Sequence, residues 1–169
     1  TADRTITFPD ADVTLGAATL APAFSVCTNA VTAIASATNT KIVLDREIFD
    51  SNSAFDATTN YRFTVPADED GKYFFSAAIN FIGTSYSGVT NIQTMLYLNG
   101  SEHGTTSSTI TNQANTTALT LNGSWILDLS VADYIELFGY WLTDGTAATY
   151  NGNATLQKTH LLGFKMVGI

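Results

Sequence analysis

The chain has 169 residues, 45% of them hydrophobic, which is enough to build the core of one domain. Its formal net charge of -8 argues against nucleic acid and anionic lipid surfaces as partners, because both are themselves negatively charged. The sequence has no run of about 18 apolar residues, so it predicts no insertion into a membrane.

The first 21 residues differ in composition from the rest. They contain one brief alternating run, Thr5 to Phe8, and too few apolar side chains to fold alone. They have neither the basic start nor the apolar stretch of a signal peptide, nor an initiator Met, so we expect the chain to be a piece of something longer. We interpret residues 1–21 as a connector and residues 22–169 as the folded domain.

Cys27 is the only cysteine, so no disulfide can form within the chain. A lone cysteine usually behaves as a small buried apolar residue, and we expect Cys27 to do so. The domain must then rely on its core, on self-assembly, or on both.

Alternating apolar and polar residues predict strands, because successive side chains of a strand point to opposite faces. The predicted strands are Tyr61–Val65, Lys72–Ile82, Asn91–Leu98, Ser124–Val131, Tyr134–Leu142 and His160–Ile169. The dipeptides that favour tight turns are Asp70-Gly71, Asn99-Gly100, Asn122-Gly123, Asp144-Gly145 and Asn151-Gly152. The polar tract 101–117 is predicted to be an exposed loop carrying a short edge strand. Together these signals predict an all-β antiparallel jelly-roll sandwich of about eight to ten strands, with essentially no helix.

Several short motifs follow one another in an order that resembles the globular head domain of complement component C-one-q, a relative of the tumour necrosis factor fold. The segments "FDATTNYRFTVP" and "GKYFF" carry the first part of the likeness. The matching positions are Phe55-Asp56, Phe63-Thr64, Gly71 to Phe75, Asn99-Gly100, Leu127-Asp128-Leu129 and Gly163-Phe164. The resemblance covers about residues 22–169 and implies the jelly roll of that family.

The start of the chain resembles bacteriophage fibre and tail proteins just upstream of a terminal knob. The segment "DRTITFPDADVTL" is similar to their connectors, and "PAFSV" followed by "TKIVLDREIFD" is similar to the start of such knobs. The two resemblances together imply a trimeric phage knob on the virion surface, joined to other virion proteins by the connector. Such a knob would bind a host surface glycan or protein. The alternative is a capsid-decorating or head-fibre protein that stabilises the virion without a specific receptor.

No arrangement of residues predicts catalysis, and we expect no enzyme and no cofactor. The segment "GTSYSG" at residues 83–88 is one residue too long for a nucleophile elbow and is followed by no helix signal. The acidic turn "ADEDGK" offers Asp68 and Asp70 as weak candidates for a calcium site. A solvated acidic turn is the simpler interpretation of those two residues.

Two loops combine polar residues with an aromatic ring, as sugar-binding loops do. Their candidate receptor-binding residues are Tyr86, Asp144, Tyr150 and Asn151. For Tyr86 and Tyr150, stacking on a sugar and packing inside the protein both remain open. We expect recognition at the end of the trimer far from the N-terminus, because a fibre shaft would enter at residues 1–20.

The run Tyr134–Leu142 is apolar on both faces. One face carries Ile135, Leu137 and Trp141, which suits a core. The other carries Tyr134, Phe138 and Tyr140, which then need a second cover that a neighbouring subunit can provide. These three aromatic residues are the predicted trimer interface.

Overall fold

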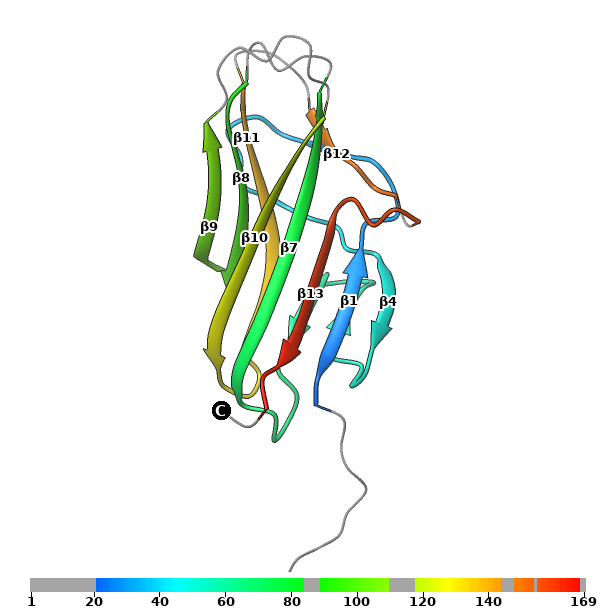
Figure 1. Ribbon diagram of the computed structural model, residues 1–169, viewed down its shortest axis with the longest axis vertical. Coiled ribbons are helices and arrows are strands. Elements are labelled where there is room, and N and C mark those ends of the chain that lie inside the picture. Colours follow the sequence, from blue (N-terminus) through cyan, green and yellow to red (C-terminus); the bar gives the residue numbers. More distant parts are fainter. Residues whose placement is uncertain (1–20, 84–88, 110–117, 144–147, 154, 168–169) are drawn as a thin grey trace, which may run out of the picture.

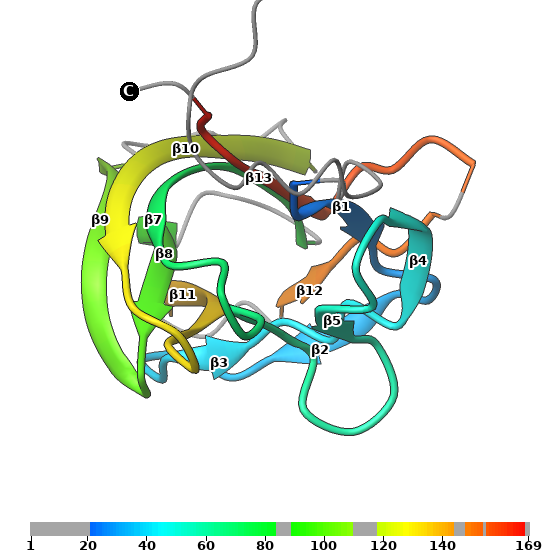
Figure 2. The same ribbon diagram turned by 90° about the horizontal axis from the view of Figure 1, so that it is seen from below.

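Two antiparallel sheets make up the computed structural model, which describes residues 21–83, 89–109, 118–143, 148–153 and 155–167 (Figure 1). Sheet A contains, in spatial order, β2 (Thr32–Ile34), β12 (Ala148–Tyr150), β7 (Gly71–Gly83), β13 (His160–Lys165), β1 (Ala23–Cys27) and β4 (Arg46–Asp50), with β10 (Ala118–Leu129) on the other side of β7. Sheet B contains β5 (Phe55–Asp56), β6 (Arg62–Thr64), β11 (Tyr134–Thr143), β8 (Val89–Leu98) and β9 (Ser101–Thr109), with β3 (Thr40–Lys41) also paired to β11. The two sheets curve around a shared interior (Figure 2).

The predicted all-β class is confirmed. The described residues contain 13 strands and no helix, and consequently no helix among them is long and apolar enough to cross a membrane. The strand count exceeds the predicted eight to ten because several strands, such as β3 and β5, are pairings of only two residues. Cys27 is fully buried, as expected. The predicted connector lies outside the described residues, except for Ala21.

Strand β7 organises sheet A because it pairs with three other strands. Its 13 residues pair with β10 along one edge, and with β13 and then β12 along the other. The predicted alternation of burial holds from Lys72 to Ala77, and beyond it Ala78 and Asn80 of the other face are buried as well. Its inward side chains are at most 1% exposed, and they are Tyr73, Phe75, Ala77, Ile79 and Phe81.

Five aromatic rings fill one end of the interior between the sheets. Phe24 of β1 lies 4.9 Å from Phe63 of β6 and 5.2 Å from Phe55, measured between ring centroids. Tyr73 and Phe75 of β7 complete the cluster, at 5.4 and 5.9 Å from Phe63. Aromatic pairs at these separations add about 0.5–1.5 kcal/mol each beyond the area they bury. The cluster therefore ties sheet A to sheet B.

Two glycines that looked like turn or loop residues instead make room for an indole ring. Asn122-Gly123 was predicted to be a turn, and this is wrong, since both residues lie inside β10 opposite Ala78 and Ala77. A Cβ at Gly123 would stand 2.2 Å from the ring of Trp125, and one at Gly104 of β9 would stand 2.3 Å from it. The Trp125 ring thus lies between the edge strands of the two sheets.

The hairpin between β8 and β9 has the predicted turn and a second strand that is longer than predicted. Asn99 and Gly100 form the turn, with φ of 51° and 79°, as the dipeptide predicts. The edge strand predicted after it is longer than expected, because eight residues of Ser101–Thr109 pair with β8. Residues 110–117 of the predicted loop lie outside the described residues. Threonine and serine suit such an edge strand, and the even polarity of the tract concealed its length.

Gly163 of β13 supports the aromatic cluster by lacking a side chain. A Cβ at this position would stand 2.6 Å from Phe75 and 2.8 Å from Phe24. We expect Gly163→Ala to lower the free energy of unfolding by about 1–3 kcal/mol, because the two rings must shift. Urea denaturation measures this loss. Ser101→Ala, at an exposed position of β9, is the control and should change stability by about 0.5 kcal/mol or less. Equal effects of the two substitutions would contradict this packing.

Candidate functional site

The outward face of sheet A carries a row of apolar side chains in register. Ile126 of β10 pairs with Phe74 of β7, which pairs with Phe164 of β13. Pairing partners share a face, and the rings of Phe74 and Phe164 lie 5.3 Å apart. Ile126 is 62% exposed and Phe164 is 44% exposed. This row therefore lies on the surface and not in the core.

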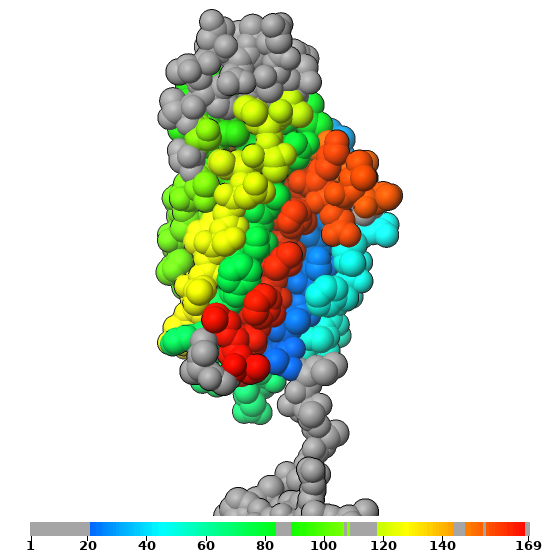
Figure 3. All heavy atoms as spheres, in the orientation of Figure 1, coloured from blue at the N-terminus to red at the C-terminus, as the bar shows by residue number. Residues whose placement is uncertain are grey.

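Further apolar residues widen this row into a patch. Two positions along, Leu162 of β13 and Phe49 of β4 flank Ser25, and Phe49 is 51% exposed. Figure 3 looks onto this face, where β10, β7, β13, β1 and β4 lie side by side. We call the set of Phe49, Phe74, Ile126, Leu162 and Phe164 the sheet A patch. A contiguous exposed patch of this kind marks an interaction surface on a protein.

The predicted interface residues lie on the opposite side of the molecule, on the outward face of sheet B. Tyr134, Phe138 and Tyr140 are all half-buried. Phe138 stacks on Tyr97 of β8 with ring centroids 4.0 Å apart. The guanidinium carbon of Arg62 lies 4.2 Å from the centre of the Tyr134 ring. Two of the three rings thus already have a partner within the chain.

A nearly buried ion pair lies on the same face. Glu136 of β11 is 8% exposed, and its carboxylate accepts a hydrogen bond of 2.5 Å from the ammonium group of Lys41. Tyr97 adds a second polar contact there, since its hydroxyl accepts a 2.7 Å hydrogen bond from Asn39. These contacts fix strand β3 to the face of sheet B.

The candidate receptor residues do not gather into one site. Tyr86 and Asp144 lie outside the described residues. The prediction for Tyr150 as a stacking ring is wrong, because β12 turns it into the core, where it is fully buried. Its hydroxyl accepts a hydrogen bond of 3.1 Å from the Val43 amide. Asn151 is half-buried, and its side chain donates to that of Asn80 at 3.0 Å.

The acidic turn before β7 holds an ion pair. The carboxylate of Glu69 lies 3.0 Å from the ammonium group of Lys165. Asp68 and Asp70 are exposed, and Asp68 has a φ of 63°. No group of three or more His, Cys, Asp or Glu residues in the described part of the chain is placed to hold a metal ion.

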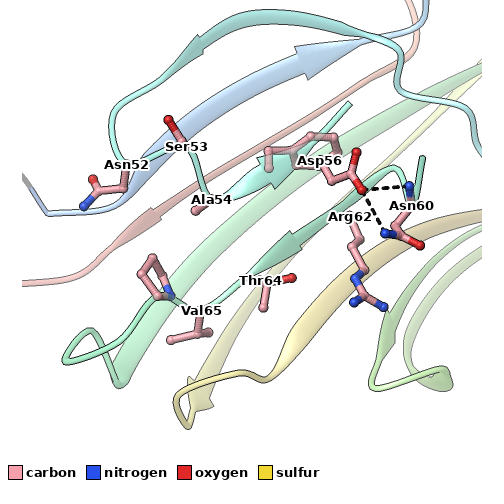
Figure 4. Close-up of a pocket in the computed structure, with 10 residues that line it drawn as sticks. Asn52, Ser53, Ala54, Asp56, Asn60, Arg62, Thr64 and Val65 are labelled. Atoms are coloured by element: carbon pink, nitrogen blue, oxygen red, sulfur yellow. Dashed lines mark hydrogen bonds between the residues drawn. The ribbon is translucent and has the colours of Figure 1, made fainter. Parts of the chain in front are cut away.

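A hollow of about 410 Å³ lies beside β5 and β6, at the edge of sheet B (Figure 4). Its polar lining includes Asn52, Ser53, Asp56, Asn60, Arg62 and Thr64. Its apolar lining is Ala54, Phe55, Val65 and Pro66. No pattern in the sequence predicted this hollow, because its residues come from a strand end, a bend and a loop that no periodic pattern connects.

Asp56 fixes one wall of the hollow. Its carboxylate accepts hydrogen bonds of 2.9 Å from the amides of Thr58 and Thr59, and of 3.0 Å from the amide of Asn60. The Thr58 hydroxyl and the Asn60 side chain also donate to it. The backbone donors of Thr59 and Thr58 are the main reason why the pKa of Asp56 lies well below its usual range. Asp56 thus stays ionised and holds the loop over residues 57–60.

The loop held by Asp56 should keep its structure in acid. A carboxyl group whose pKa is lowered on folding contributes stability above its unfolded pKa of about 3.9, and this is lost only as the pH falls through the folded value. We therefore expect the amides of Thr58, Thr59 and Asn60 to stay protected from hydrogen exchange at about pH 3 as at about pH 5. In Asp56→Ala this protection should be lost at both values. Unchanged protection in the variant would contradict the assigned role.

The fold is shared with known proteins. The globular domain of zebrafish complement 1qA protein gives a TM-score of 0.56 at 16% sequence identity, covering 88% of this chain and 99% of that chain. Murine APRIL at pH 8.0 gives 0.61 at 11% identity, covering 86% and 98%. The tumour necrosis factor Eiger from S. frugiperda gives 0.64 at 10% identity, covering 89% and 96%. The expected complement-head jelly roll is therefore confirmed as a fold.

Sequence comparison adds one bacterial relative. No protein-family model matches the chain. The uncharacterized protein YqcC of Bacillus subtilis (strain 168) is 32% identical over 123 residues, which is 71% of this chain. The chain spans 30% of the length of that relative. What these comparisons show is the jelly roll of complement globular heads and tumour necrosis factors, and a bacterial sequence to which this one is similar.

Proposed function

We propose that this domain is the trimeric knob of a phage fibre, which is exposed on the virion and binds a host surface glycan or protein. The observation that carries the proposal is the sheet A patch, in which Ile126 and Phe164 are 62% and 44% exposed to solvent. An apolar patch on a protein of this size calls for a partner. A second copy of the chain is the partner that a fibre requires.

Assembly through this patch must overcome charge repulsion. Three copies carry a formal charge of 3 × -8 = -24, so they repel one another. Burial of apolar surface contributes about 25 cal/mol per Å², and interfaces of standard size bury about 800 Å² on each partner. Polar contacts accompany apolar ones in most interfaces, and the exposed pair of Lys72 and Asp128, at 2.9 Å, lies next to the patch on the same strands.

The predicted interface of Tyr134, Phe138 and Tyr140 competes with the sheet A patch for this role. The geometry favours the patch. Phe138 already stacks on Tyr97, and Arg62 lies over Tyr134, so a neighbouring subunit would gain less new contact there. The prediction for these three residues is tested in the same experiment as the patch.

The direction of the strands supports the expected polarity of the knob. The chain enters β1 at the end of the sandwich where β13 finishes, as Figure 1 shows. The last described residues of β7 and β11, Gly83 and Thr143, lie at the opposite end. A shaft joined before β1 would present that opposite end to the host. Recognition near Tyr86, Asp144 and Asn151 remains part of this proposal.

The second candidate function is a capsid-decorating or head-fibre protein. The burial of Tyr150 favours it, because one of the two rings proposed for receptor binding serves the core. Both functions use the same assembly through sheet A. They differ in whether the isolated knob recognises a cell.

Substitution of the patch should abolish assembly. We expect the parent chain to have a mass of 3 × 18.0 = 54 kDa by size exclusion with light scattering at micromolar concentration. Ile126→Asp and Phe164→Asp should each give the 18.0 kDa monomer with an unchanged circular dichroism spectrum. Phe138→Asp is the matched variant on sheet B and should stay trimeric. A monomeric parent would refute the trimer, and a monomer only in Phe138→Asp would move the interface to sheet B.

Binding to cells separates the two candidate functions. The isolated trimeric knob should adsorb to host cells and compete with phage adsorption if it is a receptor knob. A Tyr86→Ala, Asp144→Ala double variant should stay trimeric and adsorb at least about tenfold less. A parent trimer that binds no cells would instead support the decorating function.

A further inference from the structure

We propose that the hollow beside β5 and β6 is a binding site for a saccharide that bears a carboxylate. This inference goes beyond the proposed function, because it assigns a site on sheet B that no predicted receptor residue occupies. It does not depend on the assembly of the chain or on its place in a virion. The proposal rests on one cation, Arg62, and on the hydroxyl and amide groups around it.

Arg62 is a cation without an acidic partner inside the hollow. No described residue forms a salt bridge with it, whereas Lys41, Lys72 and Lys165 each have one. The ring of Tyr134 holds its guanidinium group at 4.2 Å, which limits the positions that the side chain can take. A guanidinium group held in this way offers paired N–H donors, and a carboxylate is the ligand that fits them.

Two carboxylates lie close to Arg62, and neither competes for it. Asp56 and Glu136 are its pairing neighbours on β5 and β11. Asp56 accepts five hydrogen bonds from its own loop, from Thr58, Thr59 and Asn60, which occupy its oxygens. Glu136 is bound to Lys41 at 2.5 Å. The guanidinium group of Arg62 is therefore left for an external anion.

The rest of the hollow suits the hydroxyl groups of a sugar. Asn52, Ser53, Asn60 and Thr64 line it with amide and hydroxyl groups, which both donate and accept hydrogen bonds. Ala54, Val65 and Pro66 provide apolar surface for the carbon face of a ring. A volume of about 410 Å³ falls within the range of about 300–1,000 Å³ that is typical of small-ligand sites. The lining thus combines the Arg62 cation, the ionised Asp56 whose oxygens its own loop occupies, and several neutral polar groups on an apolar floor. This set suits a uronic acid better than a simple ion.

The loops around the hollow are fixed before any ligand binds. Ser53 and Tyr61 have φ of 52° and 45°, a conformation that costs energy in residues other than glycine. Asp50 holds the loop at residues 51–54 by accepting hydrogen bonds from the Asn52 and Phe55 amides, at 3.2 and 2.7 Å. A site built on such supported loops loses little entropy on binding.

The hollow would remain open in the proposed trimer. It lies beside β5 and β6 at the edge of sheet B and shares no residue with the sheet A patch. A trimer would carry three such hollows. It would therefore bind a polymer of repeated acidic sugars more tightly than one hollow does, even if each hollow binds weakly.

The test is a titration of the full chain, labelled with nitrogen-15, with sodium glucuronate at constant ionic strength. Backbone amide signals of Ser53, Arg62 and Thr64 should shift and saturate in the millimolar range. Glucose, which lacks the carboxylate, and acetate, which lacks the ring hydroxyls, should each bind at least about tenfold more weakly. Equal shifts with acetate and glucuronate would contradict the recognition of a saccharide. The absence of shifts with glucuronate would contradict the existence of the site.

Two variants make the test specific. Arg62→Gln should weaken glucuronate binding at least about tenfold and leave the signals of the core unchanged. Arg46→Gln on β4 removes the same charge outside the hollow and should bind as the parent does. Thr64→Val keeps the guanidinium group and should weaken binding by about threefold. If Arg46→Gln and Arg62→Gln lose the same affinity, the effect is one of net charge and the proposal fails. Light scattering on the same variants measures their oligomeric state independently of ligand binding.

Discussion

The cluster of Phe24, Phe55, Phe63, Tyr73 and Phe75 is the constraint on which the remaining structure depends. Its rings come from two strands of sheet B and two of sheet A, at centroid separations between 4.9 and 6.3 Å. Rings packed this closely fix both the distance between the sheets and the register of each strand, because a slip by one residue would turn a ring to solvent. The glycine at position 163 is a consequence of the same packing.

This constraint decides which faces remain for function. The inward side chains of β7, β10 and β13 are committed to the interior, so the outward side chains of these strands are free to vary without harming the core. On sheet A some of them are large and apolar, as Ile126 and Phe164 show, beside polar neighbours such as Lys72 and Asp128. Apolar residues contribute to stability on this face only when another surface covers them. Most protein surfaces are polar, whereas this face exposes a row of apolar side chains. This difference indicates that a partner covers the face.

The sequence predicted the parts of the fold that depend on a local pattern. The alternation in β7 and the Asn99-Gly100 turn each follow from neighbouring residues, and both were confirmed. The failures all involve tertiary contacts. Gly123 lies in a strand because the Trp125 ring needs its space, and Tyr150 is buried because β12 adds to the edge of β7. The hollow around Arg62 joins residues whose proximity only the folded chain creates.

The two surfaces described here differ in the chemistry that they can recognise. The sheet A patch is apolar, and a second protein surface can exclude water from it over a large area. The hollow around Arg62 is small and polar, so it suits a ligand whose charged and hydroxyl groups replace water one by one. Because they lie on different sheets, a trimer can bury the first surface and leave the second in solvent. Such a division lets assembly and recognition change independently, since a substitution at Arg62 touches none of the residues that would hold the subunits together.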